Sequence, residues 1–185
     1  PSTFFLAKKE AYEVERSLRF NDGDNAHLSR TPSSASNRKT RTISAWVKRG
    51  DLNGNTQVMF HAFDGSASRR FQFAFNGDNK LLYNQGGASS GGSGVATSDM
   101  VFRDINAWYH FVFVADYSNG TASDRLKVYV NGSQIDMTFS DAVTDTDGQW
   151  NGNWEHEIGV IGNTTEPFDG YMAEINFIDG TAYDA

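Results

Sequence analysis

The sequence has no cysteine, only 3 prolines and no long apolar run. A cysteine-free chain of this size cannot use disulfides, and it favours a bacterial, phage or intracellular source over a eukaryotic secreted one. No apolar run approaches the roughly 18 residues that a transmembrane helix needs, so we expect no membrane insertion. Residues 1–9 also carry lysines too early for a signal peptide.

The sequence also has fewer basic than acidic residues. It contains 16 Lys and Arg and 23 Asp and Glu, which gives a net charge of −7. An acidic chain has no general electrostatic attraction to nucleic acid or to anionic membranes. Two local basic clusters occur, at residues 38–41 and at Arg69–Arg70. We interpret both as solvated charge in loops or at strand ends, and we expect no nucleic-acid partner.

The longest apolar stretch, Trp108–Asp116, is rich in β-branched and aromatic residues and too short for a good helix. Alternation places its odd-numbered residues on one face and its even-numbered residues on the other, and both faces are apolar. Such a strand belongs in the middle of a layered β-structure. We expect Trp46 and Trp108 to lie in the core and His110 to be a structural hydrogen-bonding residue.

The rest of the chain alternates short β-prone runs with turn residues and shows no amphipathic helix. The dipeptide Asn131-Gly132 has the chemistry of a type I′ hairpin turn. The pattern predicts an all-β sandwich in one domain over residues 1–185, in which residues 1–16 form an N-terminal strand or a docking tail through Phe4-Phe5-Leu6. The predicted strands cover residues 17–20, 26–28, 41–49, 57–63, 70–75, 80–83, 100–102, 108–116, 124–130, 133–135, 157–162 and 168–178.

Six segments in family order resemble the LamG-like (laminin-G/pentraxin-like) branch of the concanavalin A-like lectin/glucanase superfamily. They are residues 17–23, 43–48, 108–112, 126–132, 161–162 and 168–175. The resemblance implies a two-sheet antiparallel jelly-roll β-sandwich of roughly 12 to 14 strands. The sequence of residues 168–180 also resembles LamG-like modules in virion proteins of tailed phages. That likeness implies a tail fibre or another surface appendage, and so a location on the virion surface or outside the cell.

Catalysis is not expected, although enzymes occur in this superfamily. Retaining glucanases of this fold carry a Glu-x-Asp-x-Glu arrangement with two carboxylates about 5 Å apart. No such motif exists in the sequence. Glu155 and Glu157 have His156 where the Asp should stand, and Glu13 and Glu15 lie outside the matched segments.

Calcium is a candidate ligand, because members of the superfamily often bind Ca²⁺ through loop oxygens at a sheet end. Two acidic clusters offer such oxygens, and they comprise Asn21, Asp22, Asp24 and Asn25 in one loop and Asp141, Asp145 and Asp147 in another. The same residue types also favour Asx turns that bind no metal. Both interpretations stay open.

A sugar site needs an aromatic platform beside amide or carboxylate hydrogen-bonding groups. The loop Gln149–His156 provides Trp150 and Trp154 with their neighbours Asn151 and Asn153, in too little apolar context to bury both rings. Alternatively, one or both rings fold back over the sandwich or pack against another subunit. A weaker second candidate is Tyr83 with Asn84, ahead of a Gly-rich loop.

Two functions follow. The favoured hypothesis is a non-catalytic lectin-like recognition module that binds a cell-surface glycan or receptor as part of a phage virion appendage. The alternative is a virion structural or decoration protein whose jelly roll mainly contacts other virion proteins or further copies of itself.

Overall fold

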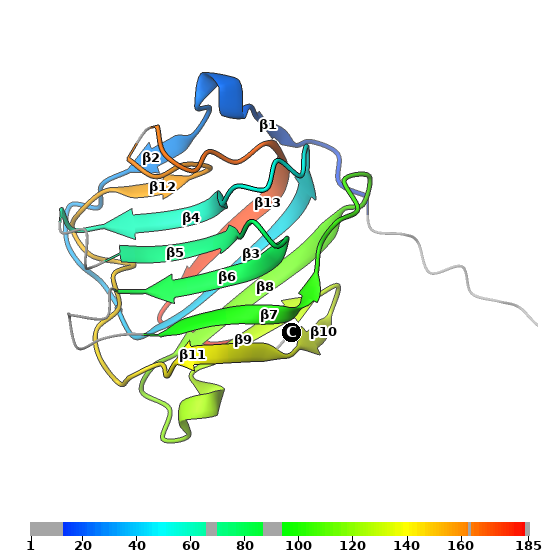
Figure 1. Ribbon diagram of the computed structural model, residues 1–185. Helices are drawn as coiled ribbons and strands as arrows, with labels where there is room; N and C mark the ends of the chain where they lie inside the picture. The colour runs from blue at the N-terminus through cyan, green and yellow to red at the C-terminus, as the bar shows by residue number, and fades with distance from the viewer. Residues whose placement is uncertain (1–12, 66–69, 87–93, 163, 184–185) are drawn as a thin grey trace, which may run out of the picture.

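The computed structural model is a sandwich of two antiparallel sheets (Figure 1). It describes residues 13–65, 70–86, 94–162 and 164–183. Sheet A contains, in spatial order, β1 (Leu18–Phe20), β13 (Gly170–Asp179), β3 (Thr40–Arg49), β8 (Tyr109–Asp116), β9 (Leu126–Val130) and β10 (Ser133–Ile135). Sheet B contains β11 (Met137–Asp141), β7 (Val95–Val101), β6 (Lys80–Gln85), β5 (Arg70–Phe75), β4 (Gln57–Phe63), β12 (His156–Ile158) and β2 (Leu28–Arg30).

The predicted all-β jelly roll is confirmed. Within the described part of the chain, helical structure is limited to two short 3₁₀ turns, Asp22–Asp24 and Ala122–Asp124. No helix of that part is long and apolar enough to cross a membrane. The Asn131-Gly132 turn has positive φ at both residues, 51° and 81°, as a type I′ hairpin requires.

The core is a block of aromatic rings held between β5 and β8. The inward side chains Phe71, Phe73 and Phe75 of β5 meet Phe111 and Phe113 of β8, with ring centroids 5.1–6.5 Å apart. Edge-to-face pairs of this kind add about 0.5–1.5 kcal/mol each beyond the burial of their area. Strand β8 therefore occupies the interior of sheet A, between β3 and β9, as its sequence predicts.

Two arginines of β3 also point into the core, so the interpretation of Arg41 as solvated charge is wrong. Arg41 is 0% exposed and lies over the ring of Tyr117, whose hydroxyl accepts a hydrogen bond from its guanidinium. Arg49, at the other end of the strand, is 1% exposed. Its guanidinium donates to Oε1 of Gln57, to Oδ1 of Asn79 and to the carbonyl of Phe102 at 2.8–3.3 Å. Burial lowers the pKa of Arg49.

Three strands differ from their predicted places. The predicted strand 26–28 corresponds to β2, which forms no hairpin with β1. Instead, β2 lies in sheet B and pairs with β12, while β1 pairs with β13 in sheet A. Strand β7 begins at Val95, five residues before the predicted strand. Strand β11, at Met137–Asp141, is absent from the predicted strands. The triplet Phe4-Phe5-Leu6 lies outside the described residues.

Loss of the Arg49 side chain should destabilise the fold strongly. Arg49→Met leaves two buried acceptor groups and the half-buried Asn79 side chain without their donor, and we expect the free energy of unfolding to fall by about 3–5 kcal/mol. Arg103→Met, at an exposed position, is the matched control and should change it by less than about 0.5 kcal/mol. Urea denaturation of both variants measures the difference, and equal stabilities would contradict a structural role for Arg49.

Candidate functional site

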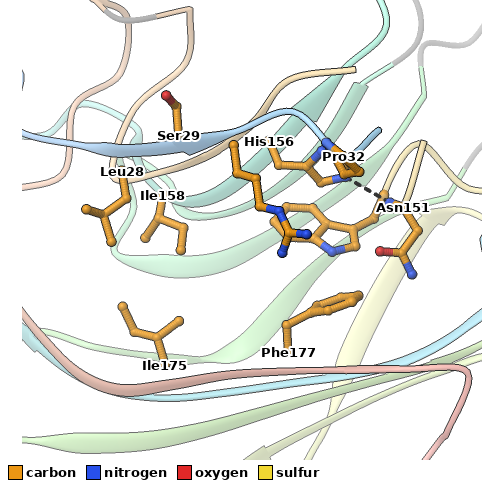
Figure 2. Close-up of a pocket in the computed structure, with 10 residues that line it drawn as sticks. Leu28, Ser29, Pro32, Asn151, His156, Ile158, Ile175 and Phe177 are labelled. Atoms are coloured by element: carbon orange, nitrogen blue, oxygen red, sulfur yellow. Dashed lines mark hydrogen bonds between the residues drawn. The ribbon is translucent and has the colours of Figure 1, made fainter. Parts of the chain in front are cut away.

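A pocket of about 260 Å³ opens between the edges of the two sheets, where β2 and β12 face β13 (Figure 2). Figure 2 shows Ile175 and Phe177 of β13 on one side and Leu28 and Ile158 on the other. The lining is mostly apolar and comprises Leu28, Ser29, Arg30, Pro32, Trp150, Asn151, His156, Ile158, Ile175 and Phe177. Two predicted sugar-binding residues, Trp150 and Asn151, therefore reach this pocket.

Trp150 is a core residue, so the expectation of an exposed platform is wrong for it. The side chain is only 6% exposed and belongs to the main core cluster. Its ring lies 5.1 Å from the ring of Phe71 and 4.7 Å from that of His156. The polar loop folds back between the sheets, and the Trp150 ring fills the end of the sandwich. This burial is favourable because protein interiors are close-packed.

The neighbouring Trp154 is half-buried, and its ring already has partners. The indole N–H donates to the carbonyl of Gln149 at 2.7 Å, and the guanidinium of Arg38 lies 4.8 Å from the ring centroid. Gly152 lies directly against the ring, since a Cβ at that position would come within 2.0 Å of it. These neighbours take up ring surface that a sugar would use. Asn153 is exposed beside it, and sugar contact through these two residues stays a prediction.

Asn151 and His156 hold this loop in place. The backbone N–H of Asn151 donates to Nε2 of His156 at 2.9 Å, and Nδ1 of His156 lies 2.8 Å from the carbonyl of Trp154. The Asn151 amide donates to the carbonyl of Asn37 and to the carboxylate of Asp179, both at 2.7 Å. His156 must therefore be neutral with its proton on Nδ1, and burial lowers its pKa.

Tyr83 and Asn84 do not form a joint surface site, because they lie on opposite faces of β6. Tyr83 is 0% exposed and shares a 2.7 Å hydrogen bond with the hydroxyl of Tyr117. Burial raises the pKa of Tyr83 well above its ordinary value. Asn84 is half-buried on the outer face of sheet B, next to Gln72 of β5.

The outer face of sheet B carries a buried polar row at paired positions of β12, β4, β5 and β6. It comprises Glu157, His61, Gln72 and Asn84. Nδ1 of His61 lies 2.9 Å from the carboxylate of Glu157, and both side chains are at most 3% exposed. Glu155 is exposed whereas Glu157 is buried in this row, so the two carboxylates do not share one solvent-open site.

Three of the predicted calcium ligands, Asp24, Asp145 and Asp147, have protein partners. Asp145 pairs with Lys39 at 2.7 Å, which lowers the pKa of Asp145, and Asp147 lies 3.6 Å from Arg38. Asp24 accepts a hydrogen bond from Asn21 beside Asp22 in a 3₁₀ turn, and Asp141 ends β11. No three His, Cys, Asp or Glu gather to hold a metal in the ranges that the structure describes. Calcium binding stays a prediction.

An aromatic surface that the sequence analysis missed lies on the outer face of sheet A. Trp46 and His110 are paired residues on β3 and β8 with ring centroids 5.0 Å apart. Trp108 lies 6.5 Å from the ring of Tyr171 on β13, which is 36% exposed. We call Trp46, Trp108, His110 and Tyr171 the aromatic face.

The core placement expected for Trp46 and Trp108 is therefore wrong, since both are half-buried on the solvent side of the sheet. A signal for this existed in the sequence. Alternation puts Trp46 on the same side of its strand as Ser44 and Lys48, and that side is polar. Tryptophan among polar neighbours on a strand indicates a surface position more than a core one.

Charged side chains lie around the aromatic face. Lys48 is the strand partner of Tyr171, and Arg19 lies 5.2 Å from the Tyr171 ring. Glu174 sits at a register shift of β13 with a φ of 49°. Burial lowers the pKa of His110, and the charge of Glu174 only partly offsets this. Rings with hydrogen-bonding groups at their rim can hold a ligand that has both apolar and hydroxyl surfaces.

Comparison with known proteins gives one family. A family model described as the concanavalin A-like lectin/glucanases superfamily matches residues 21–183. No curated protein matches the chain.

Solved structures of low sequence identity share the fold. The chain is similar to the CBM40 of Ruminococcus gnavus IT-sialidase bound to α2,3-sialyllactose, with 12% identity over 88% of this chain and 96% of that one and a TM-score of 0.61. It is also similar to mouse laminin α1 domains LG4-5, with 12% identity over 89% and 41% of the two chains and a TM-score of 0.59. A third match is domain 4 of AbnA, a GH43 extracellular arabinanase from Geobacillus stearothermophilus in complex with arabinotriose. It has 19% identity over 82% and 65% of the chains and a TM-score of 0.53.

The buried His156 should make the fold sensitive to mild acid. Because the native state holds His156 neutral, protons bind it more readily in the unfolded chain. Its contribution to stability is complete above the ordinary pKa of 6.5 and is lost as the pH falls below it. An NMR titration of the imidazole should give a pKa below 6.5, and a value at or above it would contradict the assigned hydrogen bonds.

Proposed function

We propose that this chain, which belongs to the concanavalin A-like lectin/glucanases superfamily, is a non-catalytic lectin-like module that binds carbohydrate through its aromatic face. The observation that carries the proposal is the position of Trp46, Trp108 and Tyr171 on the solvent side of a sheet whose other side already covers the core. Large rings left at a surface commonly mark a binding site.

The chemistry of the aromatic face suits a sugar better than the chemistry of the pocket does. A pyranose offers a C–H face that stacks on aromatic rings, and its hydroxyls need donors and acceptors around those rings. Lys48 and Glu174 can provide them at the rim. The lining of the pocket in Figure 2 is mostly apolar, and its polar side chains Asn151 and His156 already form hydrogen bonds within the protein.

Two solved structures that share the fold support a carbohydrate ligand by their bound molecules. One holds sialyllactose and another holds arabinotriose.

We also propose that the module is displayed on a tailed-phage appendage such as a tail fibre, where it meets a cell-surface glycan or receptor. The likeness of residues 168–180 to modules of virion proteins supports this setting. A structural or decoration role is the second candidate, and it is favoured by the exposed apolar side chains Leu18, Leu28 and Phe177. Antibody labelling of purified virions, combined with a host-attachment assay in the presence of the antibody, distinguishes the two roles.

Removal of single rings from the aromatic face should weaken glycan binding. Loss of one stacking ring corresponds to about 0.5–1.5 kcal/mol, or roughly a 2- to 12-fold rise in Kd. We expect this for Trp108→Ala and for Tyr171→Ala, measured on a glycan array and then by calorimetry with the best glycan. Both side chains lie outside the core, so the melting temperature of each variant should stay near that of the parent.

The control variant is Trp154→Ala, which removes a half-buried ring of the loop predicted from sequence. It should leave glycan affinity unchanged. A loss of binding in Trp154→Ala, with none in the two sheet variants, would move the site to the loop. An array without any bound glycan would contradict the proposed function.

A further inference from the structure

An apolar groove runs along the side of the sandwich where both sheets end. The pocket in Figure 2 continues into a second cavity, because both are lined by Leu28, Ile158 and Ile175. The second cavity extends to Arg16, Ser17 and Leu18 ahead of β1. We call the two cavities together the edge groove. Leu18, Leu28 and Phe177 on its walls are 49%, 45% and 38% exposed, so this much apolar surface lies open.

The groove also lies beside two free strand edges. β1 pairs only with β13 and β2 only with β12, and each is 3 residues long. Unpaired edges next to apolar side chains are usually covered by another segment of polypeptide. The exposed apolar side chains of the groove and the free strand edges beside it together favour a peptide segment that has apolar side chains.

One end of the groove opens into an acidic mouth. A small adjoining cavity is lined by Glu13, Glu15, Arg16 and Glu174, and it shares Arg16 and Glu174 with the groove. Three carboxylates stand against one guanidinium there. Residues 1–12, which lie outside the described residues, join the described chain at this mouth.

The order of residue types in residues 1–12 matches the order of the acidic mouth and the apolar walls of the edge groove. Counting back from Glu13, Lys9 and Lys8 come first and the triplet Phe4-Phe5-Leu6 follows. An extended chain covers at most roughly 3.3–3.6 Å per residue. The lysines can therefore lie within roughly 18 Å of Glu13, and the triplet within roughly 32 Å. Chain length therefore allows the lysines to reach the acidic mouth and the apolar triplet to reach the apolar walls.

We propose that Phe4-Phe5-Leu6 of this same chain dock in the edge groove, with Lys8 and Lys9 against the acidic mouth. The tether makes docking intramolecular, and a short tether gives an effective concentration in roughly the millimolar range. Weak apolar contacts are then sufficient to keep the groove filled. The docked segment covers the open side of the sandwich and leaves the aromatic face on sheet A free.

The absence of native cysteine gives a direct test of this docking. We would combine Ala7→Cys, next to the triplet, with Leu28→Cys on the groove wall, and follow intramolecular disulfide formation in dilute full-length protein. The matched control combines Ala7→Cys with Gln134→Cys on β10, the edge strand on the far side of sheet A. We expect the groove pair to cross-link at least tenfold faster than the control pair.

Two further variants of the groove pair separate docking from simple proximity. Adding Phe4→Ser and Phe5→Ser should slow cross-linking at least fivefold, and adding Lys8→Glu and Lys9→Glu should slow it to a lesser, salt-dependent extent. Equal rates for the groove and control pairs would overturn the proposal. A disulfide that forms between two molecules, at a rate proportional to protein concentration, would overturn it in favour of a second copy as the occupant.

Discussion

The structure depends on how strand β3 divides its side chains between two environments. Its inward side carries Ile43, Ala45 and Val47 between the buried guanidinium groups of Arg41 and Arg49, and each guanidinium is held by ring or oxygen partners from sheet B or from the loops. Two buried cations at the ends of one strand determine its register, because a shift by one residue would expose both and bury Lys48 and Trp46. The same register places the aromatic face outside.

The core, the outer face of sheet A and the edge between the sheets consequently have distinct chemistries. The core between the sheets is aromatic and closed, with Trp150 filling one end. The outer face of sheet A carries rings with polar groups at their rim, which suits a sugar. The edge between the sheets is mostly apolar and lies beside an acidic mouth, which suits the apolar, lysine-containing segment proposed to cover it. Recognition and closure of the sandwich therefore use different residues, except for Glu174, which lies beside His110 of the aromatic face and also lines the acidic mouth.

The strands and the sandwich could be predicted from the sequence because alternation and turn residues act locally, as at Trp108–Asp116 and Asn131-Gly132. The course of β2 could not, since strand pairing across sheets leaves no local signal. The site was predicted poorly for the same reason: Trp150 has polar neighbours in sequence and aromatic ones in space. Arg41 was placed outside because charged side chains usually are, and only the hydroxyl and the rings around it make its burial tolerable. The surface position of Trp46 could have been predicted, because alternation puts it on the polar side of its strand. The general expectation that tryptophan is buried led to the opposite prediction.

The central claim is that a sugar binds on the aromatic face, and the chain has 4 tryptophans that report on it separately. Each indole N–H gives its own signal in a ¹H–¹⁵N NMR spectrum, once assigned by single substitutions. Titration with a glycan selected from an array should shift the signals of Trp46 and Trp108 and leave those of Trp150 and Trp154 in place. Shifts confined to Trp150 or Trp154 would place the ligand in the pocket or the loop and contradict the account.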